Sequence, residues 1–159
     1  MSNAVARIAQ MLADGINPAL LLSILSELPV ALSSAESDRA LRLRRAVRFA
    51  VAGCVAVAVP VVLAELGKRY EVWGGHPGFP SGHTTFAASA SAVIVAYRGN
   101  YWLIVAVPLT VLMMASLVYL RHHNIPEVLG GLVLGAGLGA ILMRALSPPT
   151  ATASGTPPD

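Results

Sequence analysis

Long apolar segments separated by short polar ones dominate the chain. Three of these segments run from Ala46 to Leu66, from Tyr101 to Leu120 and from Ile125 to Leu146. Each has about the 20 residues that a helix needs to cross roughly 30 Å of hydrocarbon. Tyr101 and Trp102 stand at the start of the second segment, as interfacial aromatic anchors do. The pattern predicts three transmembrane helices.

Two further regions are apolar but less regular. Gly82 to Tyr97 is short for a span, and its small residues suit the centre of a helical bundle. Near the N-terminus, Ala4 to Ala13 has amphipathic spacing, and Gly15 to Pro18 is expected to break that helix. Ala19 to Leu32 is apolar but contains Glu27 and Pro29. The alternatives are a membrane span and a position partly in the interface, and we expect the span. The predicted fold is therefore all-α, a polytopic transmembrane helical bundle of about five membrane helices.

Composition supports the membrane class. Apolar residues make up 55% of the chain and charged residues 12%, too few for the polar surface of a soluble domain. The net charge of +3 comes mainly from arginines beside an apolar run, which argues against nucleic-acid binding. The single cysteine, Cys54, lies in an apolar stretch and is expected to pack there.

The expected organisation is one membrane domain over residues 1–146. It comprises an N-terminal region over 1–35 and a core over 46–146. Residues 147–159 are rich in Pro, Thr, Ala and Ser and are expected to be a disordered tail. No cleavable signal peptide is evident near the N-terminus. Glycines in the last segment, at positions 130, 131, 135, 137 and 139, allow close helix contact, either with a neighbour in the same chain or with a second subunit in a homo-oligomer.

Arginine sets the expected orientation. Five arginines between Arg39 and Arg48 precede the first clear span, so this side is predicted to be cytoplasmic. The chain then emerges outside over Lys68 to Ser81, turns inside near Arg98 and emerges outside again over Arg121 to Asn124. Both loops that carry histidine are thereby predicted to lie on the extracytoplasmic face.

The first candidate constellation is the run from Gly78 to Thr85, which contains Pro80-Ser81-Gly82-His83. Proline and serine before an apolar run mark a helix start that Ser81 can cap. Free amides at a helix N-terminus attract an anion, and glycine lets the anion approach the backbone. The simpler interpretation is a capped helix with an interfacial histidine.

The second constellation runs from Arg121 to Glu127. His123 and Glu127 are four residues apart, close enough for the carboxylate to accept a hydrogen bond from the imidazole. That contact fixes the tautomer and leaves the other ring nitrogen free as a nucleophile or base. An interfacial histidine pair with a capping glutamate is the simpler alternative. A metal site formed by His122, His123 and Glu127 is a third, disfavoured because adjacent histidines point in different directions.

Together these positions resemble the PAP2 superfamily of phosphatases, whose motifs read K-x6-R-P, P-S-G-H and S-R-x5-H-x3-D. The second motif matches in full at residues 80–83, and the third matches from Ser116 to Glu127 in the spacing of its serine, histidine and acid. The first aligns as Arg69, six residues, then His76-Pro77. The resemblance covers about residues 46–146.

The resemblance implies specific roles. His123 would be the nucleophile that attacks phosphorus, Glu127 its orienting partner and His83 the acid that protonates the leaving oxygen. The Ser81 and Gly82 amides would hold phosphate oxygens, with Arg69 and His76 as first-motif donors. No metal or other cofactor is expected, because cations and amides neutralise the developing charge.

Three departures from the family pattern stand out. The third-motif arginine is Leu117, the first-motif arginine is His76 and the acid is Glu127 in place of aspartate. Arg121 lies one helical turn beyond Leu117, and we hypothesise that it supplies the missing clamp if the helix continues. Lys68 is a second possible donor, or an interfacial lysine extended towards water.

The resemblance thus favours an enzyme that removes phosphate from a lipid-linked phosphate or diphosphate, such as a polyprenyl (di)phosphate or a phospholipid phosphate. Its expected partners are that lipid and the surrounding bilayer, and its expected place is a bacterial cytoplasmic membrane. The alternative is a protein that binds lipid phosphates, or scaffolds a membrane complex, without turnover. A generic pore-like bundle would leave the P-S-G-H run and the histidine–glutamate spacing unexplained.

Overall fold

The computed structural model describes residues 3–33, 35–74 and 76–146. In the described residues the chain is helical, with α1 (Asn3–Leu25), α2 (Glu27–Leu32), α3 (Glu36–Arg69), α4 (Gly82–Arg98), the short 3-10 helix η1 (Asn100–Trp102), α5 (Leu103–Tyr119) and α6 (Ile125–Leu146). The predicted all-α transmembrane bundle is confirmed. The tail predicted over 147–159 lies outside the described residues.

Four stretches are long and apolar enough to cross a membrane within the described part of the chain: Asn3–Leu32, Ser37–Arg69, Asn100–Tyr119 and Ile125–Leu146. Large apolar side chains cover their outer faces, for example Ile104 (79% exposed) and Val133 (74% exposed). Such a surface is unfavourable in water and favourable in hydrocarbon. The chain is therefore an integral membrane protein.

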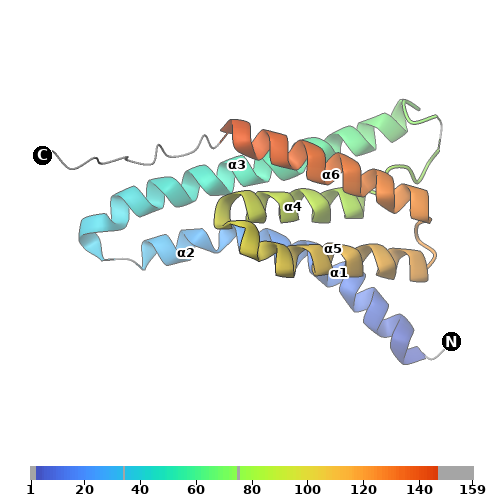
Figure 1. Ribbon diagram of the computed structural model, residues 1–159, viewed down its shortest axis with the longest axis horizontal. Coiled ribbons are helices and arrows are strands. Elements are labelled where there is room, and N and C mark those ends of the chain that lie inside the picture. Colours follow the sequence, from blue (N-terminus) through green and yellow to red (C-terminus); the bar gives the residue numbers. More distant parts are fainter. Residues whose placement is uncertain (1–2, 34, 75, 147–159) are drawn as a thin grey trace, which may run out of the picture.

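Helix α4 lies at the centre of the bundle, where it contacts α1, α3, α5 and α6 (Figure 1). Its small residues let the neighbours approach closely. Gly131 and Gly139 of α6 lie against α4, and a Cβ at these positions would stand 2.6 Å from the Ser81 carbonyl oxygen and 3.0 Å from the Ser89 Cα, respectively. The sequence allowed these glycines to contact either a helix of the same chain or a second subunit. The contact seen here is with α4, in the same chain.

The predicted break at Gly15 to Pro18 is wrong. Helix α1 continues from Asn3 to Leu25 with Pro18 inside it. A proline removes one backbone hydrogen bond from the helix. In a membrane the other peptide groups cannot hydrogen-bond to water, so they keep their helical hydrogen bonds and the helix persists. Buried Ile16 and Leu20 hold this stretch against the bundle. Helix α1 ends instead at Leu25, and α2 begins at Glu27.

The prediction for Cys54 also needs correction. Its side chain is exposed on the outer face of α3 and is not packed in the protein core. Sequence alone could not show this, because α3 is apolar on its outward and inward faces alike.

The two ends of the bundle differ in chemistry. The turns that carry the candidate site residues lie at one end, with the last turn of α3, the start of α4, the end of α5 and the start of α6 (Figure 1). Arg98 and Arg144, at the ends of α4 and α6, lie at the other end with the start of α3. The prediction that both histidine loops share one side is thus confirmed.

The Arg98 side chain connects several helices at the arginine-rich end of the bundle. Its Nη2 donates to the Ser23 carbonyl (2.9 Å), the Ser26 hydroxyl (2.9 Å) and Glu27 Oε1 (2.8 Å), and its guanidinium lies 4.9 Å from the Trp102 ring centre. One side chain thereby joins α1 and α2 to α4 and η1.

We expect Arg98→Met to lower the free energy of unfolding by about 1–3 kcal/mol, because it leaves half-buried Glu27 unpaired. Thermal unfolding in detergent measures the effect. Arg144→Met is the control, since Arg144 has no ion pair within the described residues. Equal melting temperatures for the two variants would contradict the assignment.

Candidate active site

The start of α4 is built as the sequence predicts. Ser81 is fully buried, and its hydroxyl caps the helix by accepting from the Thr84 amide at 3.4 Å. The Ser81 amide donates to the Glu127 carbonyl at 2.9 Å, so in this structure it is not open to a ligand. Among the described residues, nothing accepts from the amides of Gly82 and His83. These two are the open donors of the helix terminus.

The turn between α5 and α6 reverses the chain sharply. Helix α5 ends at Tyr119, and Arg121 has a left-handed φ of 59°. The amides of His122 and His123 then donate back to the Leu117 carbonyl at 3.0 and 3.3 Å. The condition for Arg121 to replace the missing clamp, a helix that continues as far as Arg121, is therefore not met. The Arg121 side chain is exposed and does not line the pocket described below.

A reciprocal cap fixes the start of α6. The Asn124 side chain accepts from the Glu127 amide at 3.0 Å, while Glu127 Oε2 accepts from the Asn124 amide at 3.1 Å. This is a capping box with asparagine as the N-cap. It places the Glu127 carboxylate, in a residue only 6% exposed, at the positive end of the α6 dipole.

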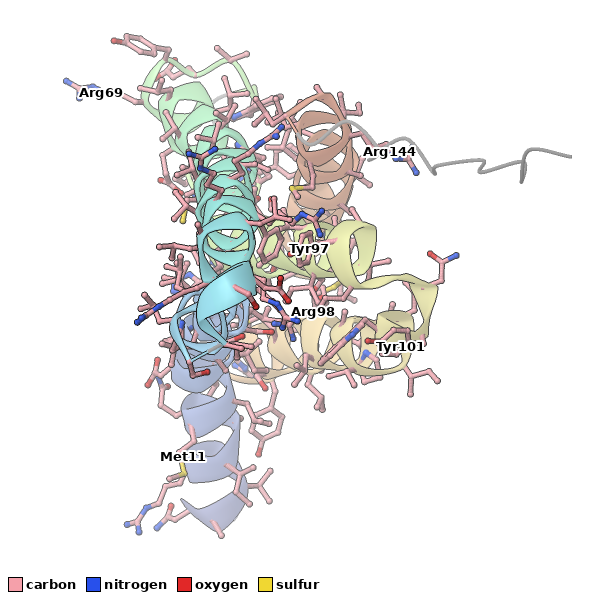
Figure 2. All side chains as sticks on the ribbon, turned by 90° about the vertical axis from the view of Figure 1, so that its left-hand side faces the viewer. Met11, Arg69, Tyr97, Arg98, Tyr101 and Arg144 are labelled. Carbon is pink, nitrogen blue, oxygen red and sulfur yellow. The ribbon has the colours of Figure 1, made fainter. Side chains whose placement is uncertain are left out.

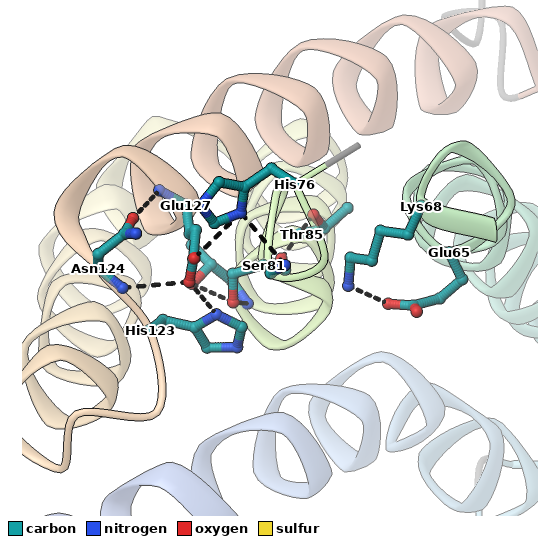
Figure 3. Close-up of polar contacts among 10 residues, drawn as sticks. Glu65, Lys68, His76, Ser81, Thr85, His123, Asn124 and Glu127 are labelled. Carbon is teal, nitrogen blue, oxygen red and sulfur yellow. Dashed lines mark hydrogen bonds and ion pairs between the residues drawn. The ribbon is translucent and has the colours of Figure 1, made fainter. Parts of the chain in front are cut away.

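Glu127 holds His123 as predicted. Its Oε2 accepts from His123 Nδ1 at 2.7 Å, a distance typical of a charge-assisted hydrogen bond (Figure 3). Nδ1 therefore carries the proton, and Nε2 is left without a partner among the described residues. His76 Nδ1 lies 3.5 Å from the other carboxylate oxygen, so the structure places His76 beside Glu127. His76 does not line the pocket described below.

The rings of His83 and His123 converge. Their centres are 6.4 Å apart, although 40 residues separate them in the chain. They share a pocket of about 370 Å³ with side chains from α1, α3 and α4: Asn17, Val61, Glu65, Lys68, Gly82 and Phe86. The gap between the two rings suits one phosphoryl group hydrogen-bonded on opposite sides.

The cation of the pocket is Lys68. Its side chain is 16% exposed and points towards the start of α4 (Figure 3). Arg69, the aligned first-motif donor, is exposed and points outwards from the C-terminal end of α3 (Figure 2). Consecutive helical residues differ by about 100° in direction, so only one of them can face the pocket. The structure does not bring Arg69 to the other site residues.

A comparison with known families matches residues 40–150 to the PAP2 superfamily. The chain belongs to the PAP2 superfamily. A lipid A 1-phosphatase from Helicobacter pylori is 37% identical over 74 residues, covering 45% of this chain and 36% of that protein. The chain thus matches about a third of the length of this curated relative. No solved structure matches the chain.

Leu117 is a departure from the PAP2 pattern. It stands where the third PAP2 motif has arginine, and it is 2% exposed within the apolar core. Its direction leads into the core, so an arginine there would need a different local arrangement. Leucine at this position cannot make the bidentate phosphate contact that an arginine can make.

No group of three or more His, Cys, Asp or Glu side chains in the described ranges is arranged to hold a metal ion. His122, one of the three ligands weighed from the sequence, is exposed on the turn.

Asn124 and Asn17 are among the site residues that the sequence analysis does not identify. Asn124 has a detectable signal, the N-x-x-E spacing of a capping box. Asn17 has none: it comes from α1, outside the matched PAP2 region, and its amide nitrogen lies 3.4 Å from the His83 carbonyl. Only the packing of α1 across α4 brings it into the pocket.

Proposed function

We propose that this PAP2 protein removes phosphate from a lipid-linked phosphate or diphosphate through a phosphohistidine intermediate. The observation that carries the proposal is the shared pocket of His83 and His123, with His123 Nδ1 held by Glu127 at 2.7 Å. A tethered imidazole with a free Nε2, in one pocket with a second imidazole, is an arrangement for nucleophilic attack and proton transfer.

In the proposed reaction, His123 Nε2 attacks phosphorus and the bond to the leaving oxygen breaks. Protonated His83 gives its proton to that oxygen. Glu127 stabilises the positive charge that forms on the His123 ring. Water then attacks the phosphohistidine, the P–N bond breaks, and His83 takes the proton of the water to restore the starting state.

Charge at the pocket supports the same proposal. Lys68 lines the pocket from α3, and Gly82 and His83, whose amides have no acceptor among the described residues, line it from α4. These donors are fixed before substrate arrives, which is what lets them stabilise a transition state. The site lies at an end of a membrane bundle, so a lipid tail can stay in hydrocarbon while the phosphate enters the pocket.

The distribution of charge supports the proposed sidedness of the site. The arginine-rich start of α3 lies at the end opposite the histidines, which supports a site on the extracytoplasmic face of a bacterial cytoplasmic membrane. The PAP2 relative named a lipid A 1-phosphatase supports a lipid phosphate as substrate. Polyprenyl phosphates and diphosphates and phospholipid phosphates all fit the proposal.

The test is phosphate release by the purified protein in detergent from a panel of lipid phosphates. Release from at least one lipid, lost in the His83→Ala variant, is the expected result. Binding of lipid phosphates with no release from any of them would favour the second candidate, a non-catalytic lipid-phosphate-binding protein. Buried Leu117 in place of the PAP2 arginine is the observation behind that candidate.

Lys68 is expected to contribute more to kcat/KM than Arg69. Lys68→Met should reduce kcat/KM by about 10- to 100-fold, because it removes the cation that faces the phosphoryl group. Arg69→Met, which removes the same charge one residue later, should cause a smaller loss. Steady-state kinetics on the preferred lipid measure both variants. A larger loss of kcat/KM for Arg69→Met than for Lys68→Met would show that Arg69 is the first-motif phosphate donor.

A further inference from the structure

The pocket contains an anion of its own. Glu65 lies one turn before Lys68 on α3, and its Oε1 is 2.8 Å from Lys68 Nζ (Figure 3). A carboxylate is an unusual lining for a pocket that receives phosphate, because like charges repel. Neither the PAP2 motifs quoted above nor the proposed mechanism uses Glu65.

The Glu65 carboxylate lies close to the start of α4. Glu65 Oε1 packs against Gly82, so closely that a Cβ at Gly82 would collide with it, and Lys68 Nζ would lie 3.9 Å from that Cβ. The carboxylate therefore stands beside Gly82, at the N-terminus of α4, and next to the pocket cation. This is where the helix dipole and Lys68 together favour a negative charge.

We propose that Glu65 occupies the anion position of the pocket and competes with phosphate for it, which makes Glu65 a determinant of anion affinity. The inference rests on the proposed function. The Glu65 side chain is 55% exposed, so it can turn towards water when a substrate phosphate enters. After hydrolysis its return to Gly82 and Lys68 displaces inorganic phosphate, which favours product release.

A purely structural role predicts the opposite sign. If Glu65 only held Lys68 in place, removal of its charge would loosen the cation and weaken phosphate binding. If Glu65 competes, removal of its charge frees Lys68 and the α4 terminus and strengthens binding. The sign of the change separates the two roles.

The experiment measures the inhibition constants of inorganic phosphate and orthovanadate for the full chain in detergent, with the preferred lipid as substrate. Glu65→Gln keeps the shape and removes the charge. We expect both inhibition constants to fall about two- to fivefold, the size of a half-exposed ion-pair effect. Glu71→Gln is the matched control, because it removes the same charge from an exposed residue outside the pocket.

Glu65→Asp provides a second variant. It keeps the charge on the same turn as Lys68 but draws the carboxylate back from Gly82, so a smaller fall is expected. Unchanged or raised inhibition constants in both Glu65 variants would overturn the inference while leaving the proposed function intact. A wild-type protein that neither releases phosphate nor binds either anion would overturn the proposed function itself, and the inference with it.

Discussion

His123→Ala is expected to lower phosphate release by about a thousandfold or more, the largest effect predicted for any substitution. Removing a nucleophile eliminates the covalent route, and what remains is binding and charge stabilisation by the rest of the pocket. The buried Glu127 carboxylate would also lose its 2.7 Å partner. Lipid-phosphate binding should fall far less than turnover, since Lys68 and the α4 amides are untouched.

The control for this variant is His122→Ala. His122 is adjacent and also an imidazole, but it is exposed and does not line the pocket. Its removal should change kcat by less than a few-fold. Both variants are measured by initial rates at saturating lipid, with melting temperatures recorded to show that they fold. Turnover that survives His123→Ala in a folded protein would exclude His123 as the nucleophile.

Gly135→Ala is expected to destabilise the bundle by about 1–3 kcal/mol, the cost of overpacking a tight contact. A Cβ at Gly135 would collide with the Thr85 carbonyl oxygen of α4 and lie 3.0 Å from the Ala88 Cβ. The carbonyl belongs to the backbone and cannot turn away, so α4 and α6 must separate. Because α4 carries His83 and α6 carries Glu127, that separation should also lower turnover.

Gly137→Ala is the matched control on the same helix. Nothing lies within 4 Å of a Cβ at this position, so only the helix propensity changes, which favours alanine by up to about 1 kcal/mol. Thermal unfolding in detergent and kcat are measured for both. A Gly135→Ala protein as stable and as active as Gly137→Ala would show that α4 and α6 do not pack as closely as the structure has them.

The sequence predicted the features that local rules determine. Ile125–Leu146 was predicted with its observed bounds, because a polar turn and a proline mark its start and an arginine its end. The Ser81 cap and the hydrogen bond between His123 and Glu127 also follow from spacing alone: in a first helical turn, residues three or four apart face each other.

Features that depend on how one helix packs on another were not predictable. Lys68 and Arg69 are equally plausible by composition, and only the rotation of α3 about its axis selects Lys68. The reach of Asn17 into the pocket depends on where α1 crosses α4. Arg121 was misjudged for a different reason: α5 ends at Tyr119, and no glycine or proline marks that end.

The central claim is that His123 carries the phosphoryl group during turnover, and trapping that intermediate tests it most directly. The protein is mixed with lipid substrate labelled in its phosphate, quenched in alkali within the first turnover and analysed by peptide mass spectrometry. We expect an alkali-stable phosphate on the peptide that contains His123, and none on the corresponding peptide of His123→Ala. Turnover by the wild-type protein with the label on another residue, or with label retained by His123→Ala, would contradict it.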